Sequence, residues 1–388
     1  DLANQVISKN KHRHGKTLKA ERKFTDQQKI NQLPEVFVVE QEEDESELIV
    51  SEIRRLKSEG RKLKDLAVLY RSNSQGAWIE SSLRKSRIEY SISGGTSIFD
   101  RKELKDVLAY LRQSLYPQDV TFKRIINTPP RGIGDTTIER LNSFAAAQNL
   151  SFLEATKRWR EAGVPDRAGE SLESLQKFLW TLPTFLLEGN GTDASKTPGD
   201  RLVKAIRDMG YRDYLMQMSR DPGAGDKRWN LVEIFGRILD SALQKRGYTQ
   251  SALREFLESL MLRDSPDEVE NKDEVQLMTL HASKGLEFPV VFLCGVEEDL
   301  LPHKNLGSDL DEERRLFYVG ITRAQEHLIL TRCQQRKRNG VIKRVTASRF
   351  LLEIPKNMYQ EFSQGVRPVS GVARDQLVAQ FLKSLDKA

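Results

Sequence analysis

Cysteine is scarce in this sequence, since Cys294 and Cys333 are the only two among 388 residues. They make no metal-ligand spacing, and so few thiols are typical of a reducing compartment in which they stay inert. Long apolar runs are also missing, because none approaches the roughly 20 residues that span a bilayer. These absences argue against a disulfide scaffold, a cysteine-held metal and a membrane partner, and they predict a cytoplasmic protein.

A complete phosphate-binding loop is missing as well. The stretch NKHRHGKT ends in Gly15-Lys16-Thr17, which matches the tail of the pattern Gly-x-x-x-x-Gly-Lys-Ser/Thr. The first glycine of that pattern would fall at position 10, where the sequence has Asn10, and no apolar strand precedes it. We therefore interpret the triplet as part of a solvated basic linker and not as a nucleotide site.

What is present is ordinary for a water-facing protein, with 38% hydrophobic and 30% charged residues. A chain of this length can bury two or three cores. The formal net charge of +6 and the pI near 9.1 weakly favour a polyanionic partner. Residues 1–7 have the pattern of a helix end, so we expect the chain to begin inside a longer protein.

Two kinds of hydrophobic pattern divide the chain. Apolar runs typical of buried strands occur at 36–39, 66–70, 88–92, 275–280, 290–294 and 327–331. Helical patterns separate the first three runs, at 44–57 and around Ile79 and Leu83, and this alternation implies right-handed crossovers in a parallel sheet. Helical patterns alone dominate from about residue 95 to 262. The predicted fold class is therefore α/β, with one parallel-sheet domain split by a mostly helical insertion.

Local turn and cap signals refine this organisation. Gly60 is placed to end the 44–57 helix, and Asp100 with Glu103 has the spacing of a capping box. Asp135 is placed to cap a further helix. The pair Asn339-Gly340 between basic flanks predicts a two-residue hairpin turn.

The densest polar cluster lies in TLHASKGLEFPVVFL, residues 279–293. We expect it at the carboxyl ends of parallel strands, where open α/β sheets bind ligands. Lys284 offers a point charge for phosphate, Gly285 allows close backbone approach, and Glu287 can accept hydrogen bonds from a ribose. This stretch is the predicted nucleotide site, and a plain connecting loop is the alternative.

Residues 311–330 read as a helix with an acidic first turn that leads into a strand. Arg323 follows the small, apolar sequence Gly320-Ile321-Thr322. An arginine in this position is either a salt-bridge partner or a finger aimed at a transferring phosphoryl group.

Two further stretches allow a functional and a plain interpretation. Glu297, Glu298 and Asp299 follow a buried strand, as Mg²⁺-binding carboxylates do, but acidic loops there are common. Gly132-Ile133-Gly134 makes a tight turn before a helix, where backbone N–H groups bind phosphates and Arg131 adds charge. The alternative is a helix–helix turn without a ligand.

The chain also resembles a known family. VQLMTLHASKGLEFPVVFLCGVEEDLLPH and EERRLFYVGITRA resemble motifs V and VI of the superfamily 1 DNA helicases of the UvrD, PcrA and Rep type. LAVLYRSNSQ, ISGGTSIFDRKELKDVLAYLR and NTPPRGIG resemble the same family, in the same order. The resemblance covers nearly the whole chain.

The resemblance implies a domain organisation and residue roles. Residues 1–94 and 272–388 would form the second RecA-like domain, and 95–271 the inserted helical (2B-type) domain. The residues implied to bind ATP are Lys284, Gly285, Glu287 and Arg323, the last as catalytic finger. The residues implied to bind DNA are Arg71 and His281 for the single strand, and Arg131, Gly132, Ile133 and Gly134 for the duplex ahead of the fork.

The resemblance thus implies the C-terminal part of an ATP-dependent 3′→5′ DNA helicase, and it leaves open whether the role is DNA repair, replication restart or plasmid copying. The family's Walker A loop, Mg²⁺ ligands and adenine-stacking tyrosine would precede Asp1. ATP and Mg²⁺, single-stranded DNA, the single-strand–duplex junction and the missing N-terminal RecA-like domain are the implied cofactors and partners. Two alternatives stay open, which are a non-catalytic DNA-binding or partner-docking protein and the motor subunit of a recombination helicase–nuclease.

Overall fold

The computed structural model describes residues 2–10, 33–189, 196–219, 221–261, 272–304, 309–338, 341–363, 365 and 367. The Gly15-Lys16-Thr17 triplet and the turn pair Asn339-Gly340 lie outside these residues. Asn10, at the position of the missing glycine, is buried, donates to the Asp311 carbonyl at 2.9 Å and accepts from Arg314 at 2.7 Å.

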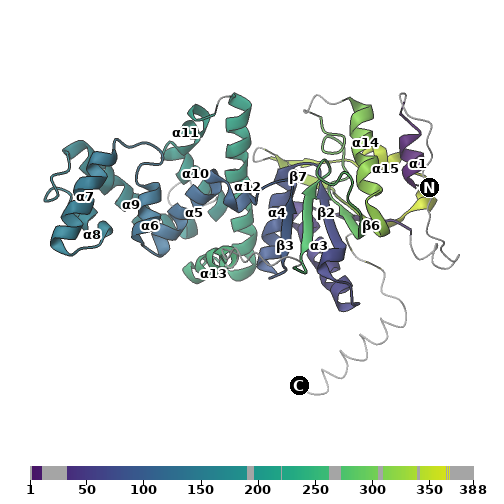
Figure 1. Ribbon diagram of the computed structural model, residues 1–388, viewed down its shortest axis with the longest axis horizontal. Helices are drawn as coiled ribbons and strands as arrows, with labels where there is room; N and C mark the ends of the chain where they lie inside the picture. The colour runs from purple at the N-terminus through teal and green to yellow at the C-terminus, as the bar shows by residue number, and fades with distance from the viewer. Residues whose placement is uncertain are drawn as a thin grey trace, which may run out of the picture. The chain divides into compact units, whose positions relative to one another are not determined.

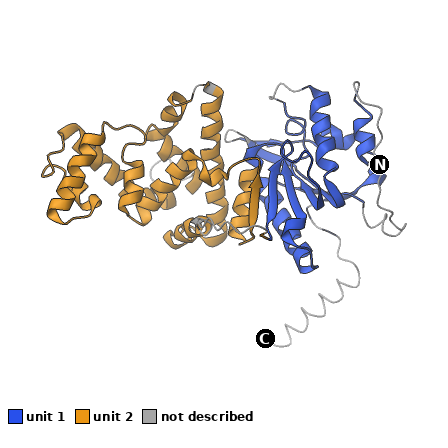
Figure 2. Cartoon of the chain, viewed as in Figure 1, with its two compact units in different colours: residues 1–75, 273–388 blue, residues 76–272 orange. Residues whose placement is uncertain are grey.

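The chain forms two compact units, Asp1–Gln75 with Asp273–Ala388 (unit 1) and Gly76–Lys272 (unit 2), coloured in Figure 2. The predicted domain boundaries were 94/95 and 271/272, and the units divide at 75/76 and 272/273. The two units are defined by how tightly their residues pack, whereas the predicted domains follow the family resemblance. The extent of the two domains therefore stays a prediction.

A seven-stranded sheet confirms the predicted α/β class and the RecA-like parallel sheet with a helical insertion (Figure 1). Its strands are β1 (Glu35–Val39), β2 (Leu66–Tyr70), β3 (Tyr90–Ser93), β4 (Val275–Thr279), β5 (Phe288–Leu293), β6 (Ala324–Cys333) and β9 (Gln360–Ser363). Their order is β3-β4-β2-β5-β6-β1-β9, and β1, β2, β4, β5, β6 and β9 pair in parallel. Every residue of β1 and β2 is buried, as expected for strands covered on both faces.

Helices in unit 1 cover this sheet. They are α1 (Leu2–Ile7), α3 (Glu42–Ser58), α14 (Leu310–Ile321) and α15 (Arg349–Leu352), with 3₁₀ turns η1 (Leu63–Asp65) and η4 (Lys356–Met358). In α3 the predicted apolar positions Ile49, Ile53 and Leu56 are buried, and Gly60 follows the helix end with φ +92°. The predicted helix and its glycine stop are confirmed.

Unit 2 is helical with its own apolar core. Besides β3, its elements are α4 (Asn73–Lys85, which begins in unit 1), η2 (Ile98–Asp100), α5 (Lys102–Leu115), α6 (Asp119–Ile125), α7 (Asp135–Gln148), α8 (Phe152–Lys157), α9 (Asp166–Glu188), α10 (Pro198–Asp208), α11 (Tyr211–Gln217), α12 (Pro222–Arg246) and α13 (Gln250–Met261). None of the described helices is both long and apolar enough to cross a bilayer.

Two predicted helix caps are wrong. The N-cap of α5 is Arg101, because Asp100 belongs to the preceding 3₁₀ turn and pairs with Lys105 at 2.9 Å. The N-cap of α7 is Gly134, so Asp135 is the first helical residue. In both places the polar residue lies one position away from a cap, where its charge still complements the helix dipole or a neighbouring lysine.

A hairpin of β7 (Gln335–Arg338) and β8 (Val341–Arg344) follows β6 and confirms the predicted antiparallel pairing around the turn. Arg336 anchors it in the interior of unit 1. Its guanidinium donates to Glu297 at 2.6 and 2.8 Å and to Glu45 at 2.7 Å, and all three side chains are buried. The network thus connects α3, the segment after β5 and the hairpin.

Candidate functional site

The predicted site residues of unit 1 lie at two opposite edges of the parallel sheet. Arg71 directly follows β2 and His281 follows β4, so both lie at the carboxyl edge. Glu287 and Arg323 directly precede β5 and β6, at the amino edge. The prediction that the whole 279–293 stretch lies at carboxyl ends of strands is wrong for Glu287, because the stretch crosses from the carboxyl edge to the amino edge.

The crossing segment, residues 280–287, connects the end of β4 to the start of β5. At its beginning the Leu280 N–H donates to the Tyr70 carbonyl at 2.9 Å, beside the end of β2. Gly285 has φ +86°, a conformation that favours glycine. His281, Lys284, Gly285 and Glu287 are all exposed. The segment therefore presents a base, an ammonium and a carboxylate to solvent on one short connection.

Arg323 is half-buried and is held entirely by neutral acceptors. Its Nε donates to the Val319 carbonyl at 3.0 Å, Nη1 to the Leu286 carbonyl at 2.7 Å and Nη2 to Thr322 Oγ1 at 3.0 Å. Within the described part of the chain it makes no ion pair, so the salt-bridge alternative finds no support. The guanidinium is oriented by these bonds, but its positive charge is left available to an anion.

Glu287 and Arg323 are brought together by the pairing of β5 with β6. The Phe288 N–H donates to the Arg323 carbonyl at 2.9 Å, and Gln325 Nε2 donates to the Glu287 carboxylate at 3.3 Å. A cation and a hydrogen-bond acceptor thus lie on neighbouring strand starts. The cation suits the phosphates of a nucleotide, and the acceptor suits the hydroxyls of its ribose.

Helix α14 approaches the crossing segment closely at Gly320. A Cβ on this residue would lie 2.5 Å from Leu280 Cδ2 and 3.3 Å from Leu293 Cδ2, and both leucines are fully buried. Only glycine permits this approach, three residues before Arg323. The close packing fixes the distance between α14 and the segment that carries Lys284.

Replacing Gly320 by alanine should lower the free energy of unfolding by about 1–3 kcal/mol through overpacking. This loss is expected although the exchange favours a helix interior by about 1 kcal/mol. Chemical denaturation of the chain measures it. Gly95→Ala is the control, since its Cβ would meet only Ile92 Cγ2 at 3.7 Å; equal stability of the two variants would contradict the packing argument.

Arg71 is buried rather than presented to a ligand. Its Nη2 lies 2.6 Å from Glu313 Oε1, and the two side chains are 6% and 1% exposed. Glu313 also accepts from the His303 N–H at 3.0 Å. In this conformation Arg71 offers no charge to a bound strand, so its predicted DNA contact stays a prediction. Sequence reasoning missed Glu313, whose one signal was the acidic first turn of its helix.

In unit 2 the hydrogen bonds of Arg131 hold the predicted duplex-binding turn in shape. Arg131 donates through Nη1 to the Ile125 and Pro129 carbonyls at 2.9 and 3.1 Å and through Nη2 to Tyr110 Oη at 2.6 Å. Ile133 is fully buried, whereas Gly132 and Gly134 are exposed at the amino end of α7. Arg131 and Ile133 therefore shape the turn, and the two glycines form its free surface.

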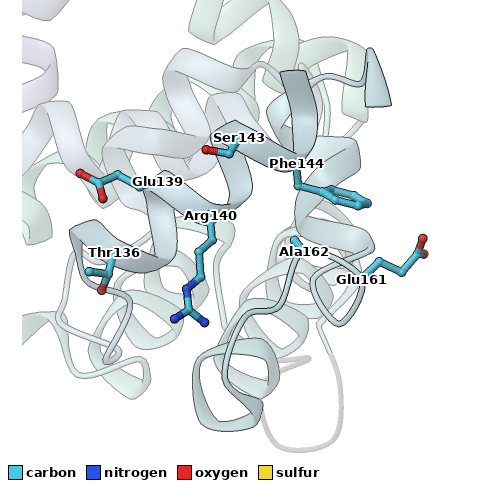
Figure 3. Close-up of a pocket in the computed structure, with 7 residues that line it drawn as sticks. All are labelled: Thr136, Glu139, Arg140, Ser143, Phe144, Glu161 and Ala162. Atoms are coloured by element: carbon cyan, nitrogen blue, oxygen red, sulfur yellow. The ribbon is translucent and has the colours of Figure 1, made fainter. Parts of the chain in front are cut away.

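A hollow lies along the same helix, between α7 and the residues after α8 (Figure 3). It is lined by Thr136, Glu139, Arg140, Ser143, Phe144, Glu161 and Ala162. Figure 3 shows these side chains spread around an open space without converging on one point. None of the predicted site residues lines it.

The carboxylates considered for Mg²⁺ each have a cation of their own. Glu297 pairs with Arg336 at 2.6 Å, Glu298 with Arg349, and Asp299 with Lys304 at 3.8 Å. They therefore do not converge on one ion, and they fit a structural role better than a metal site.

Comparison with known proteins extends this description. A sequence model of the family described as "UvrD-like helicase C-terminal domain" matches residues 1–159 and 169–335. The ATP-dependent DNA helicase PcrA of Bacillus subtilis is 36% identical over 374 residues, covering 93% of this chain and 48% of that protein. The ATP-dependent DNA helicase Rep of Escherichia coli is 38% identical over 369 residues, covering 92% and 52%. The chain therefore spans about half the length of the curated relatives it matches.

Proposed function

This chain belongs to the UvrD-like helicase C-terminal domain family, and from that premise we propose that it is the C-terminal part of an ATP-dependent 3′→5′ DNA helicase. The observation that carries the proposal is Arg323. Its guanidinium is oriented by three neutral acceptors, one of them the carbonyl of Leu286 next to Glu287 in the chain, and it lacks an ion pair among the described residues. An arginine held in this way suits the charge that develops on a transferring phosphoryl group.

The nucleotide contacts follow from the exposed groups of the crossing segment. Lys284 would supply a point charge to the phosphates, and Glu287 would accept hydrogen bonds from the ribose hydroxyls. Gly285 lets the backbone come close to the ligand. Mg²⁺, held by residues of an N-terminal RecA-like domain, would neutralise phosphate charge in the complete enzyme. Closing the cleft between the two domains would place Arg323 at the γ-phosphate and couple hydrolysis to domain motion.

DNA contacts are proposed in both units. In unit 1 the exposed His281 would touch the single strand, and Arg71 would support this DNA surface while it stays paired with Glu313. In unit 2 the exposed backbone of Gly132 and Gly134, at the start of a helix of 14 residues, would meet duplex phosphates near the single-strand–duplex junction. Such contacts carry no base information, as expected for an enzyme that moves along any sequence.

The isolated chain 1–388 should show no ATP hydrolysis above buffer, with or without single-stranded DNA. Half of the nucleotide site would be supplied by the N-terminal domain, so the chain by itself cannot hold the phosphates and metal. A coupled ATPase assay measures this, and the full-length protein is the control, with unwinding of a 3′-tailed duplex as second readout. DNA-stimulated turnover by the chain alone would contradict the shared site. A full-length protein without turnover would instead indicate a non-catalytic DNA-binding protein.

A further inference from the structure

Helix α14 connects the two edges of the sheet that the proposed function assigns to different ligands. It follows β5 and precedes β6, which are parallel neighbours, so it runs from the carboxyl edge back to the amino edge. Its 12 residues span about 18 Å. The carboxyl edge carries His281, the proposed DNA contact, and the amino edge carries Arg323 and Glu287.

The amino end of α14 is fixed at the carboxyl edge by one buried carboxylate. Glu313 accepts from Arg71 Nη2 at 2.6 Å and from Arg71 Nε at 3.1 and 3.2 Å, and from the His303 N–H at 3.0 Å. Arg71 is itself held, because Gln75 Oε1 accepts from its backbone N–H at 3.0 Å. Separating a buried pair of this kind leaves a charge without compensation, so the helix start cannot slide freely.

The other end of α14 determines where Arg323 lies. Arg323 Nε donates to the Val319 carbonyl in the last turn of the helix. Gly320 packs against Leu280, at the start of the crossing segment. A displacement of α14 would therefore move Arg323 and the crossing segment together.

We propose that Glu313 is a positioning residue that couples the DNA edge of this unit to Arg323. Through its bond to Arg71 it holds α14 in register with the end of β2, so that a strand bound at the carboxyl edge biases the placement of the arginine at the amino edge. This inference rests on the proposed function, and it adds a residue that touches neither proposed ligand.

A neighbouring ion pair on the same helix provides a matched control. Arg314 donates to Glu353 at 2.9 and 3.2 Å, and Arg314 is as buried as Arg71. This pair connects α14 to the residue after α15, away from the end of β2 and from the crossing segment. Glu353 is 24% exposed, against 1% for Glu313. Glu353→Gln therefore removes an arginine's carboxylate partner on the same helix without touching the connection between the edges.

The test compares the full-length wild-type protein, Glu313→Gln and Glu353→Gln in ATP hydrolysis with and without a thymidine oligonucleotide. In Glu313→Gln we expect kcat at saturating DNA to fall about 100-fold, because a misplacement of about 1 Å at the reacting groups costs this much. The KM for ATP should change no more than in Glu353→Gln. The kcat values are compared below the thermal midpoints of both variants, because Glu313 is 1% exposed and its loss destabilises the fold more than the loss of Glu353, which is 24% exposed. Equal DNA-stimulated kcat in the two variants would overturn the inference alone. A wild-type protein without DNA-stimulated turnover would overturn the proposed function and this inference with it.

Amide hydrogen exchange of chain 1–388 gives a readout that does not need turnover. Adding the oligonucleotide should change exchange at Leu286–Phe288 and in the last turn of α14 in the wild type and in Glu353→Gln, but not in Glu313→Gln. An equal DNA-induced change in Glu313→Gln would contradict the coupling.

Discussion

Replacing Arg323 by alanine in the full-length protein is expected to lower the kcat of DNA-stimulated ATP hydrolysis by about 10³–10⁵-fold, the range known for arginine fingers. The reason is the state of its guanidinium, which is oriented by the Val319 and Leu286 carbonyls and has no anionic partner in the part of the chain that the structure describes. Steady-state kinetics of the variant measures the loss. Affinity for single-stranded DNA should stay within about twofold, because Arg323 lies at the edge of the sheet opposite to His281.

Two companion variants make this result specific. Arg349→Ala removes an arginine that already pairs with Glu298 and is 53% exposed, and its turnover should match the wild type. Arg323→Lys keeps the charge but loses the forked donors, so it should recover only part of the activity. Normal ATP hydrolysis by Arg323→Ala would contradict the proposed role of Arg323 as an arginine finger. An equal loss of DNA binding would place Arg323 in the DNA surface instead.

Replacing Arg336 by methionine is expected to lower the free energy of unfolding by about 3–5 kcal/mol, as removal of one partner from a buried ion pair does. Arg336 lies between the buried Glu45 and Glu297, and the exchange leaves both carboxylates without their cation. Urea denaturation of the chain at neutral pH measures the loss. The pair Arg349–Glu298, whose side chains are 53% and 26% exposed, is the control, since Arg349→Met should cost less than about 1 kcal/mol. Equal losses would contradict the burial argument.

The same exchange should carry a pH signature. Burial alone would raise the pKa of Glu45, but the charge of Arg336 and hydrogen bonds from Thr331, Arg336 and the Gly295 N–H lower it below its usual range. The wild type therefore keeps this stabilisation above the ordinary carboxyl pKa and loses it as the pH falls below that value. In Arg336→Met burial dominates and raises the pKa of Glu45, so that variant gains stability as the pH falls. The difference in stability between the two proteins should narrow towards acid pH, and a constant difference would contradict this assignment.

Local patterns determined the elements of this protein. The continuous apolar runs of β1 and β2 need cover on both faces, and they alternate with helices, so a parallel α/β sheet followed from the sequence. In α3 the spacing of Ile49, Ile53 and Leu56 predicted the buried face of the helix, because this pattern depends only on residues that are close together in the sequence. The densest polar motifs, around Lys284 and Arg323, were found for the same reason.

Only the tertiary structure decided which charges are free to act. Arg71 looks equivalent to Arg323 in the sequence, but Arg71 is neutralised by Glu313, whereas Arg323 donates to neutral acceptors. Such a partner is distant in the sequence, so the local spacing of residues does not predict it. Burial then makes the ion pair hard to separate. The sequence by itself therefore identified the family, the sheet and the motifs. The long-range contacts decided that Arg71 is paired with a buried carboxylate and that Arg323 makes no ion pair among the described residues.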